Sequence, residues 1–275
     1  MTISSASKQG QVQLRIEGQV AHVVLNHPGK LNAMSRVMWL QLREVFEGLQ
    51  DNPSLRCVVL RGHDGHFCAG GDISEYPGFR FDEAQLRHFH EVEVWGGLQA
   101  VLACDVPVVA HIEGNCMGAG LEIASCCDIR LASPNAKFGA PIAKLGFPMA
   151  PREAALVLSQ LGATLTRQVL LEAAVFDAQA LQDSNFLSVL LPVSTVDAEL
   201  EVARRVARLC ALAPVAARLN KQTFRTLNPY LSLDKQGLAA SESIANLLAH
   251  AYTYAASEEH REGIDAFLNK RQPAF

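Results

Sequence analysis

The chain has 275 residues, of which 49% are hydrophobic and 19% charged, and its formal net charge at pH 7 is −4. A chain of this size forms one large domain, or a core with a smaller appendage. The charged residues form no block of one sign along the sequence, which argues against a protein that binds nucleic acid or membrane surfaces. The polar N-terminus lacks the apolar core of a signal peptide, and no apolar run reaches the roughly eighteen residues of a membrane span. The sequence therefore predicts a cytoplasmic protein.

Seven cysteines stand at positions 57, 68, 104, 116, 126, 127 and 210. They include no C-x-x-C pair and no companion histidine at zinc-site spacing, and most have apolar neighbours in the sequence. This pattern predicts reduced thiols in the core rather than disulfides or metal ligands.

The first hundred residues alternate between strand and helix patterns. Two runs of strand character, 11–17 and 20–25, flank a Glu17-Gly18 turn signal and predict a β-hairpin. Apolar residues at helical spacing follow. They predict a helix over 35–49 and one long helix over 81–103, and the short apolar run between them predicts a strand over 57–60.

Residues 107–129, PVVAHIEGNCMGAGLEIASCCDI, join an apolar strand to a helix through a bend that contains three glycines in seven residues. The helix carries one carboxylate in its first turns, Glu122. Glycines let the backbone approach a ligand closely, and the unpaired N–H groups of a helix start attract negative charge. A second glycine-rich segment, RGHDGHFCAGGD, follows the strand over 57–60. The two segments indicate a catalytic site, although a plain loop-to-helix junction would have the same local pattern.

The rest of the chain changes character near residue 195. Before it, residues 128–132 have the pattern of a further strand, and 137–141 that of an irregular connection. After it, the pattern is entirely helical, with helices predicted over 198–211, 215–227, 233–255 and 257–270. We therefore expect an α/β core with largely parallel strands over 1–195 and a helical C-terminal subdomain over 196–275.

The crotonase superfamily, which includes the enoyl-CoA hydratases and isomerases, has motifs that four stretches of the chain resemble. In order, these are LNHPGKLNAMS, HFCAGGDISE, PVVAHIEGNCMGAGLEIASCCDIRLASPNAKFGAP and EGIDAFLNKRQPAF. The resemblance implies a spiral of ββα units, assembly as a homotrimer or a dimer of trimers, and an acyl-coenzyme A thioester as substrate. It implies no metal or redox cofactor.

The resemblance also implies a site. The backbone N–H groups of Gly71 and Ala119 would hold the thioester oxygen while negative charge develops on it as an enolate. The carbonyl of Ala69 would meet the adenine amino group. Further contacts with the coenzyme are implied for Lys30, Phe267 and Lys270, the last two often across a subunit interface. Asp72 and Asp128 lie inside matching motifs, but we interpret them as structural acids that bond the local backbone.

One acid of the family pattern is absent. Typical hydratases of this family use two glutamates around one water; Glu122 matches the first, and Ile142 occupies the position of the second. Glu113 and Glu153 are candidate substitutes, although neither stands at a matching position. The reaction therefore stays open among hydration, isomerisation, decarboxylation and thioester hydrolysis, and a protein that binds acyl-CoA without catalysis is a further alternative.

Overall fold

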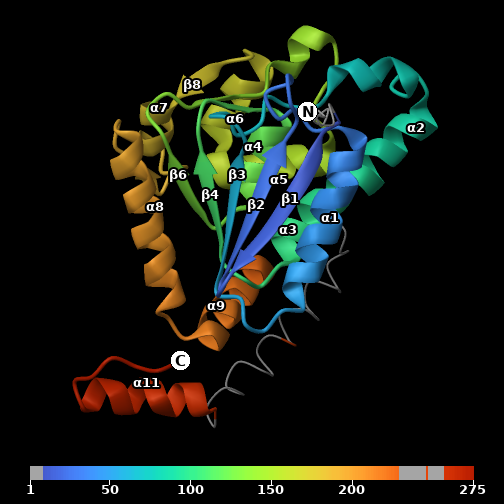
Figure 1. Ribbon diagram of the computed structural model, residues 1–275. Coiled ribbons are helices and arrows are strands. Elements are labelled where there is room, and N and C mark those ends of the chain that lie inside the picture. The colour runs from blue at the N-terminus through green and yellow to red at the C-terminus, as the bar shows by residue number, and fades with distance from the viewer. Residues whose placement is uncertain (1–8, 229–245, 247–256) are drawn as a thin grey trace, which may run out of the picture.

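The computed structural model describes residues 9–228, 246 and 257–275. Its main sheet is parallel, except that the first strand pairs antiparallel with the second, as the predicted hairpin requires. The spatial order of the strands is β1-β2-β3-β4-β6-β9 (Figure 1). They are β1 (Gln11–Glu17), β2 (Val20–Asn26), β3 (Cys57–Gly62), β4 (Val108–Ile112), β6 (Ile129–Ala132) and β9 (Val189–Leu190).

A second, smaller sheet consists of β5 (Asn115–Met117), β7 (Lys137–Gly139) and β8 (Val175–Asp177). Strands β4 and β5 lead into helix α4 (Ala119–Cys126), and strands β6 and β7 lead towards helix α5 (Pro151–Leu161). Each such unit places one strand in each sheet before its helix, which is the expected spiral of ββα units. The irregular connection predicted over 137–141 was wrong, because its first three residues form β7.

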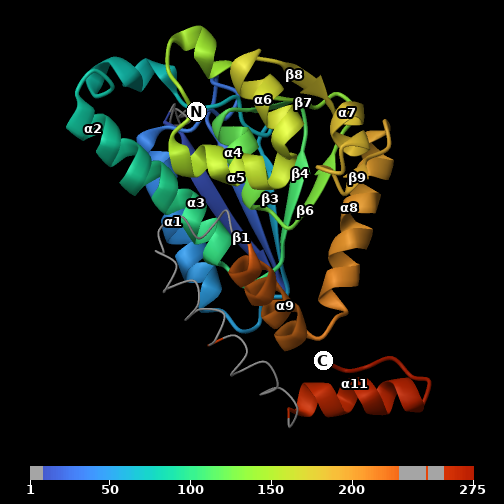
Figure 2. The same cartoon turned by 180° about the vertical axis from the view of Figure 1, so that it is seen from behind.

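Helices cover both faces of the main sheet (Figures 1 and 2). Successive residues of a strand point to opposite faces, so a sheet covered on both sides needs apolar residues at consecutive positions. Val58 lies in the core with helices α1 (Arg36–Gln50) and α3 (Trp95–Ala103), whereas Val59 packs with Ala198 and Val202 of helix α8 (Thr195–Cys210). The expected boundary at residue 195 stays a prediction, and α8 is the helix that closes the outer face of the sheet.

The single helix predicted over 81–103 differs from the structure in its middle. Helix α2 (Glu83–His88) continues into a π-helix, η2 (Phe89–Val94), and then into α3. A π-helical turn contains an extra residue, so it changes which side chains face the core, and such segments are frequent at functional sites. Here Phe89, His90 and Val94 of η2 all line one cavity.

The remaining elements are η1 (Ile73–Gly78), η3 (Pro141–Leu145), α6 (Ala163–Leu171), α7 (Ala178–Asp183), α9 (Pro214–Leu227) and α11 (Glu258–Leu268). Glu259 of α11 accepts hydrogen bonds from the backbone N–H groups of Val215 and Ala216, so α11 lies beside the start of α9 and at the opposite end of the molecule from α2 (Figure 1). The helix predicted over 233–255 falls outside the described residues apart from residue 246. No helix among the described residues is both long and apolar enough to cross a membrane.

Candidate active site

The two glycine-rich segments lie against each other. The N–H of Cys68 donates to the carbonyl of Asn115 at 2.8 Å, and the N–H of Met117 donates to the carbonyl of Cys68 at 2.9 Å. Gly118 has φ +47° and ψ −110°, which favours glycine, and a Cβ at Gly120 would lie 2.6 Å from the Cys68 carbonyl oxygen. The absence of side chains therefore lets the first turn of α4 sit directly on the segment that precedes Gly71.

Two backbone N–H groups remain available at this junction. Gly71 and Ala119 both line the cavity, and neither N–H donates a hydrogen bond within the described part of the chain. Ala119 is the first residue of α4, where an N–H has no partner inside the helix. Unpaired donors at a helix start favour an anion or a polarised carbonyl oxygen.

Glu122 is buried in the first turn of α4 and lines the same cavity. Within the described residues, no hydrogen bond or ion pair joins its carboxyl group to another residue. Burial raises the pKa of Glu122 well above its ordinary value, and repulsion from the Glu153 carboxylate raises it further. A raised pKa favours the protonated form of this carboxyl group, and an acid in that form can transfer a proton to a developing anion.

Glu153 enters the cavity from the first turn of α5 and is 3% exposed. Its Oε1 lies 2.7 Å from Nδ1 of His90, and Nε2 of that ring lies 3.3 Å from a terminal nitrogen of Arg80. A guanidinium can only donate hydrogen bonds, so Nε2 accepts from Arg80 and Nδ1 donates to the Glu153 carboxylate. Arg80, His90 and Glu153 are therefore joined by two successive hydrogen bonds, and the last of the three is the second buried carboxylate of the cavity.

Arg80 is held by two rings. Its guanidinium carbon lies 4.6 Å from the ring centre of Tyr76 and 3.8 Å from that of Phe147. Burial lowers the pKa of Arg80, and burial raises the pKa of Tyr76 to about 12. The remaining wall is largely apolar, in a cavity of about 200 Å³. A small acyl group with one polar end fits these surroundings.

Comparison with known proteins shows the family to which the chain belongs. The family model described as enoyl-CoA hydratase/isomerase matches residues 15–275. The chain belongs to the enoyl-CoA hydratase/isomerase family. It is therefore an enzyme of the hydratase/isomerase type that acts on acyl-CoA, and its fold is that of the crotonase superfamily.

Individual relatives of the family extend over almost the whole chain. The 2,3-dehydroadipyl-CoA hydratase of Escherichia coli is 30% identical over 258 residues, which is 94% of this chain and 95% of that protein. The crotonyl-CoA hydratase of Syntrophomonas wolfei is 28% identical and covers 95% of this chain and 96% of its own length. A crystal structure of an enoyl-CoA hydratase/carnithine racemase from Magnetospirillum magneticum aligns with a TM-score of 0.86 at 34% identity, over 96% of this chain and 94% of that one.

The positions of the two family glutamates differ in character. Glu122 occupies the first, whereas Ile142 presents a half-buried apolar side chain to the cavity at the second. Of the two candidate substitutes, Glu153 lines the cavity. Glu113 does not, and its backbone carbonyl accepts a hydrogen bond from Phe67.

The residues that the family resemblance assigns to coenzyme A binding do not all line this cavity. Ala69 lines the cavity. Lys30 Nζ lies 2.6 Å from Asp72 Oδ2 and 2.8 Å from the hydroxyl of Ser74, so its charge is already paired. Asp72 also accepts from the N–H of Ser74 and caps η1, and Asp128 accepts from the N–H of Val108, as expected for structural acids.

Phe267 and Lys270 belong to the C-terminal part of the family pattern. Lys270 is exposed just beyond α11, and the side chain of Phe267 lies outside the described part of the structure. Lys270 does not line this chain's own cavity. The contact of both residues with coenzyme A stays a prediction, as does the subunit interface across which the family places it.

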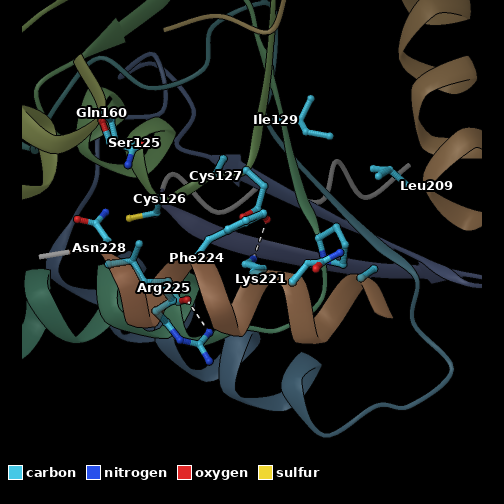
Figure 3. Close-up of a pocket in the computed structure, with 15 residues that line it drawn as sticks. Ser125, Cys126, Cys127, Ile129, Gln160, Leu209, Lys221, Phe224, Arg225 and Asn228 are labelled. Carbon is cyan, nitrogen blue, oxygen red and sulfur yellow. Dashed lines mark hydrogen bonds and ion pairs between the residues drawn. The ribbon is translucent and has the colours of Figure 1, made fainter. Parts of the chain in front are cut away.

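A second cavity, of about 420 Å³, lies between the end of α4 and helix α9 (Figure 3). Its two lining cations already have acidic partners. Lys221 Nζ lies 2.7 Å from Asp128, and Arg225 lies 2.8 Å from Asp105. Although this cavity is larger, its charges are neutralised by the surrounding fold, so the smaller cavity at Glu122 is the better candidate for catalysis.

Sequence reasoning missed His90 and Arg80. Arg80 stands in a short connection and His90 in what reads as a regular amphipathic helix, so no local spacing links either residue to Glu153. The charged and histidine-rich run HFHEVE over 88–93 was the available signal, since a helix facing the core seldom carries so many polar groups without partners.

Proposed function

We propose that the chain binds a 2-enoyl-CoA in the cavity at Glu122 and catalyses its hydration through an enolate of the thioester. The N–H groups of Gly71 and Ala119 would hold the thioester oxygen, and Glu122 would transfer a proton at the carbon next to the thioester. The observation that carries this proposal is the meeting of two unpaired N–H groups and one buried carboxyl group in a single cavity.

The two parts act on the same electron pair. When a nucleophile adds to the double bond, charge moves onto the thioester oxygen, where each fixed N–H donor lowers the barrier by about 3 kcal/mol. The enolate then takes a proton at Cα, and the raised pKa of Glu122 favours the protonated form that would supply it. No step of this sequence requires a metal or a redox cofactor.

Relatives named as hydratases support addition of water as the reaction. The second candidate is movement of a double bond within the acyl chain, which needs only one acid and is favoured by Ile142 at the second position. Initial rates of crotonyl-CoA hydration and of 3-enoyl-CoA isomerisation, measured on one preparation, distinguish the two.

The proposal extends to the surroundings of the site. The carbonyl of Ala69 would bind the adenine amino group, and Lys30, Phe267 and Lys270 would contact the coenzyme. The family pattern supports a homotrimer or a dimer of trimers, and we propose a cytoplasmic location. A sedimentation measurement gives the subunit number directly.

The test of the proposed function is Glu122→Gln. The amide keeps the size of the side chain but cannot supply the proton, so turnover should fall at least about a hundredfold while coenzyme A affinity, measured by competition, stays within about threefold. Glu113→Gln is the matched control, because Glu113 lies outside the cavity, and it should leave turnover unchanged. Unchanged turnover in Glu122→Gln would remove this residue from the mechanism.

A further inference from the structure

The cavity contains a second buried carboxylate that the family pattern does not assign. Glu122 and Glu153 are the two carboxylates among its described lining residues. Ile142 contributes only hydrocarbon there. With Glu122 assigned to the proton at Cα, Glu153 is the carboxylate left among the described lining residues to receive a proton from water at the β-carbon of the substrate.

The surroundings of Glu153 stabilise a negative charge on its carboxylate. It is the third residue of α5, which begins at Pro151, and the start of a helix favours a carboxylate. His90 donates to it at 2.7 Å, and Arg80 donates to the far side of the same ring at 3.3 Å. The guanidinium thus fixes the tautomer in which the ring proton points at the carboxylate.

The surroundings of Glu122 and Glu153 differ, and the difference assigns the role of acid to one and of base to the other. Glu122 has no donor within the described residues to stabilise its charge, whereas Glu153 has His90. Burial and the Glu153 carboxylate raise the pKa of Glu122, which favours its protonated form, while the hydrogen bond from His90 stabilises the carboxylate of Glu153. Two titratable groups whose surroundings differ in this way take opposite parts in proton transfer.

We propose that Glu153 is the catalytic base for water and that His90 is a positioning residue for it, together replacing the glutamate absent at Ile142. This inference rests on the proposed function. Glu153 takes one proton from water as the water oxygen bonds to Cβ. The electrons of the double bond move to the thioester oxygen held by Gly71 and Ala119. Glu122 then gives its proton to Cα as the carbonyl re-forms, and the proton on Glu153 returns to Glu122 through solvent.

The test separates the two glutamates by two reactions of the same protein. Hydration of crotonyl-CoA requires both, whereas exchange of the Cα hydrogens of butyryl-CoA in D₂O requires only the enolate site and Glu122. Glu153→Gln should lower hydration at least about a hundredfold and leave exchange within about threefold. Glu91→Gln, which changes a half-exposed glutamate of η2 paired with Arg152, should change neither rate.

The outcomes also separate this inference from the proposed function. If Glu153→Gln hydrates crotonyl-CoA at the normal rate, or if the unmodified protein exchanges Cα hydrogens but does not hydrate, the inference is overturned and the enolate site stands. If Glu122→Gln leaves exchange intact, the proposed role of Glu122 fails, and the hydration rate of Glu153→Gln still decides whether Glu153 acts. A protein that does neither reaction overturns both.

Two further variants test the roles directly. Ile142→Glu should raise hydration little in the unmodified protein, because the base is already present, but should restore at least a tenth of it in Glu153→Gln. His90→Leu should lower kcat for hydration about tenfold or more with little change in KM, and His90→Asn, whose amide can still donate to Glu153, should recover most of that loss. Equal losses in both His90 variants, with exchange lost too, would indicate a purely structural role.

Discussion

Cys68 and Cys116 pair as a parallel β-bridge, and their backbones hold the two glycine-rich turns of the site together. Both side chains are fully buried, and the Cys68 thiol donates to the carbonyl of Gly70 at 3.4 Å within its own turn. The relative position of the two N–H donors, one from each turn, therefore depends on how closely the backbones can approach.

Gly120→Ala tests this dependence. A Cβ at Gly120 would lie 2.6 Å from the Cys68 carbonyl oxygen, so α4 must move away from the glycine-rich segment that contains Cys68. A displacement of about 1 Å in a catalytic group costs on the order of a hundredfold in rate, and we expect kcat/KM to fall at least tenfold. Steady-state kinetics measure it. Gly48→Ala is the control, since an exposed helical glycine with open space around it should gain up to about 1 kcal/mol of stability and keep its activity.

Patterns of apolar residues predicted the elements whose packing they determine. The hairpin, α1, β3, β4 and β6 lie within one or two residues of their predicted positions. Two local features were not predicted from the sequence. Strand β7 has three residues, too few to show a period, and the π-helix η2 keeps the apolar spacing of an α-helix while shifting its register.

Local sequence patterns indicated only the part of the site whose residues are neighbours in sequence, and the family resemblance added Gly71 and Ala69. The glycine bend and Glu122 belong to one strand-turn-helix segment, and the structure places both at one cavity. Glu153, His90 and Arg80 come from separate elements, and Glu153 and His90 are 63 positions apart in the sequence. Only tertiary packing brings them together, so sequence could name Glu153 as a candidate without a reason to prefer it to Glu113.

The cysteines should be nearly inert in the folded protein. Burial raises the pKa of Cys57, Cys68 and Cys127 to about 12, and the pKa values of the other thiols are raised as well. Thiolate is the reactive form, and Cys210 is the one cysteine that is not fully buried. We expect a disulfide reagent at pH 8 to label at most one thiol per chain quickly, and all seven in denaturant. Rapid labelling of two or more would contradict the burial described here.

The stability of the protein should depend on pH through Glu122. Its pKa is raised in the folded state, so between the ordinary glutamate pKa and this raised value the folded state binds more protons than the unfolded state. The free energy of unfolding therefore decreases as pH rises through this window. Glu122→Gln cannot ionise, and we expect its stability relative to the unmodified protein to increase from pH 5 to pH 8. Urea unfolding of both proteins at the two pH values measures the difference, which should be absent in Glu113→Gln.

Arg130 should matter for stability rather than for catalysis. Its side chain is 8% exposed, donates to the carbonyls of Phe186 at 2.6 Å and Cys127 at 2.8 Å, and stacks on the Phe186 ring at 4.5 Å. Arg130→Met keeps the hydrocarbon but leaves the Cys127 carbonyl at the end of α4 and the Phe186 carbonyl without this donor, which should cost about 2–4 kcal/mol in urea unfolding. Arg204→Met removes an exposed arginine paired with Glu201 and should cost less than about 1 kcal/mol. Arg130 contacts the end of α4, whereas Glu122 lies in its first turn, so kcat at 25 °C should stay within about threefold in the fraction of Arg130→Met that is folded. A loss of activity without a loss of stability would assign Arg130 to the site instead.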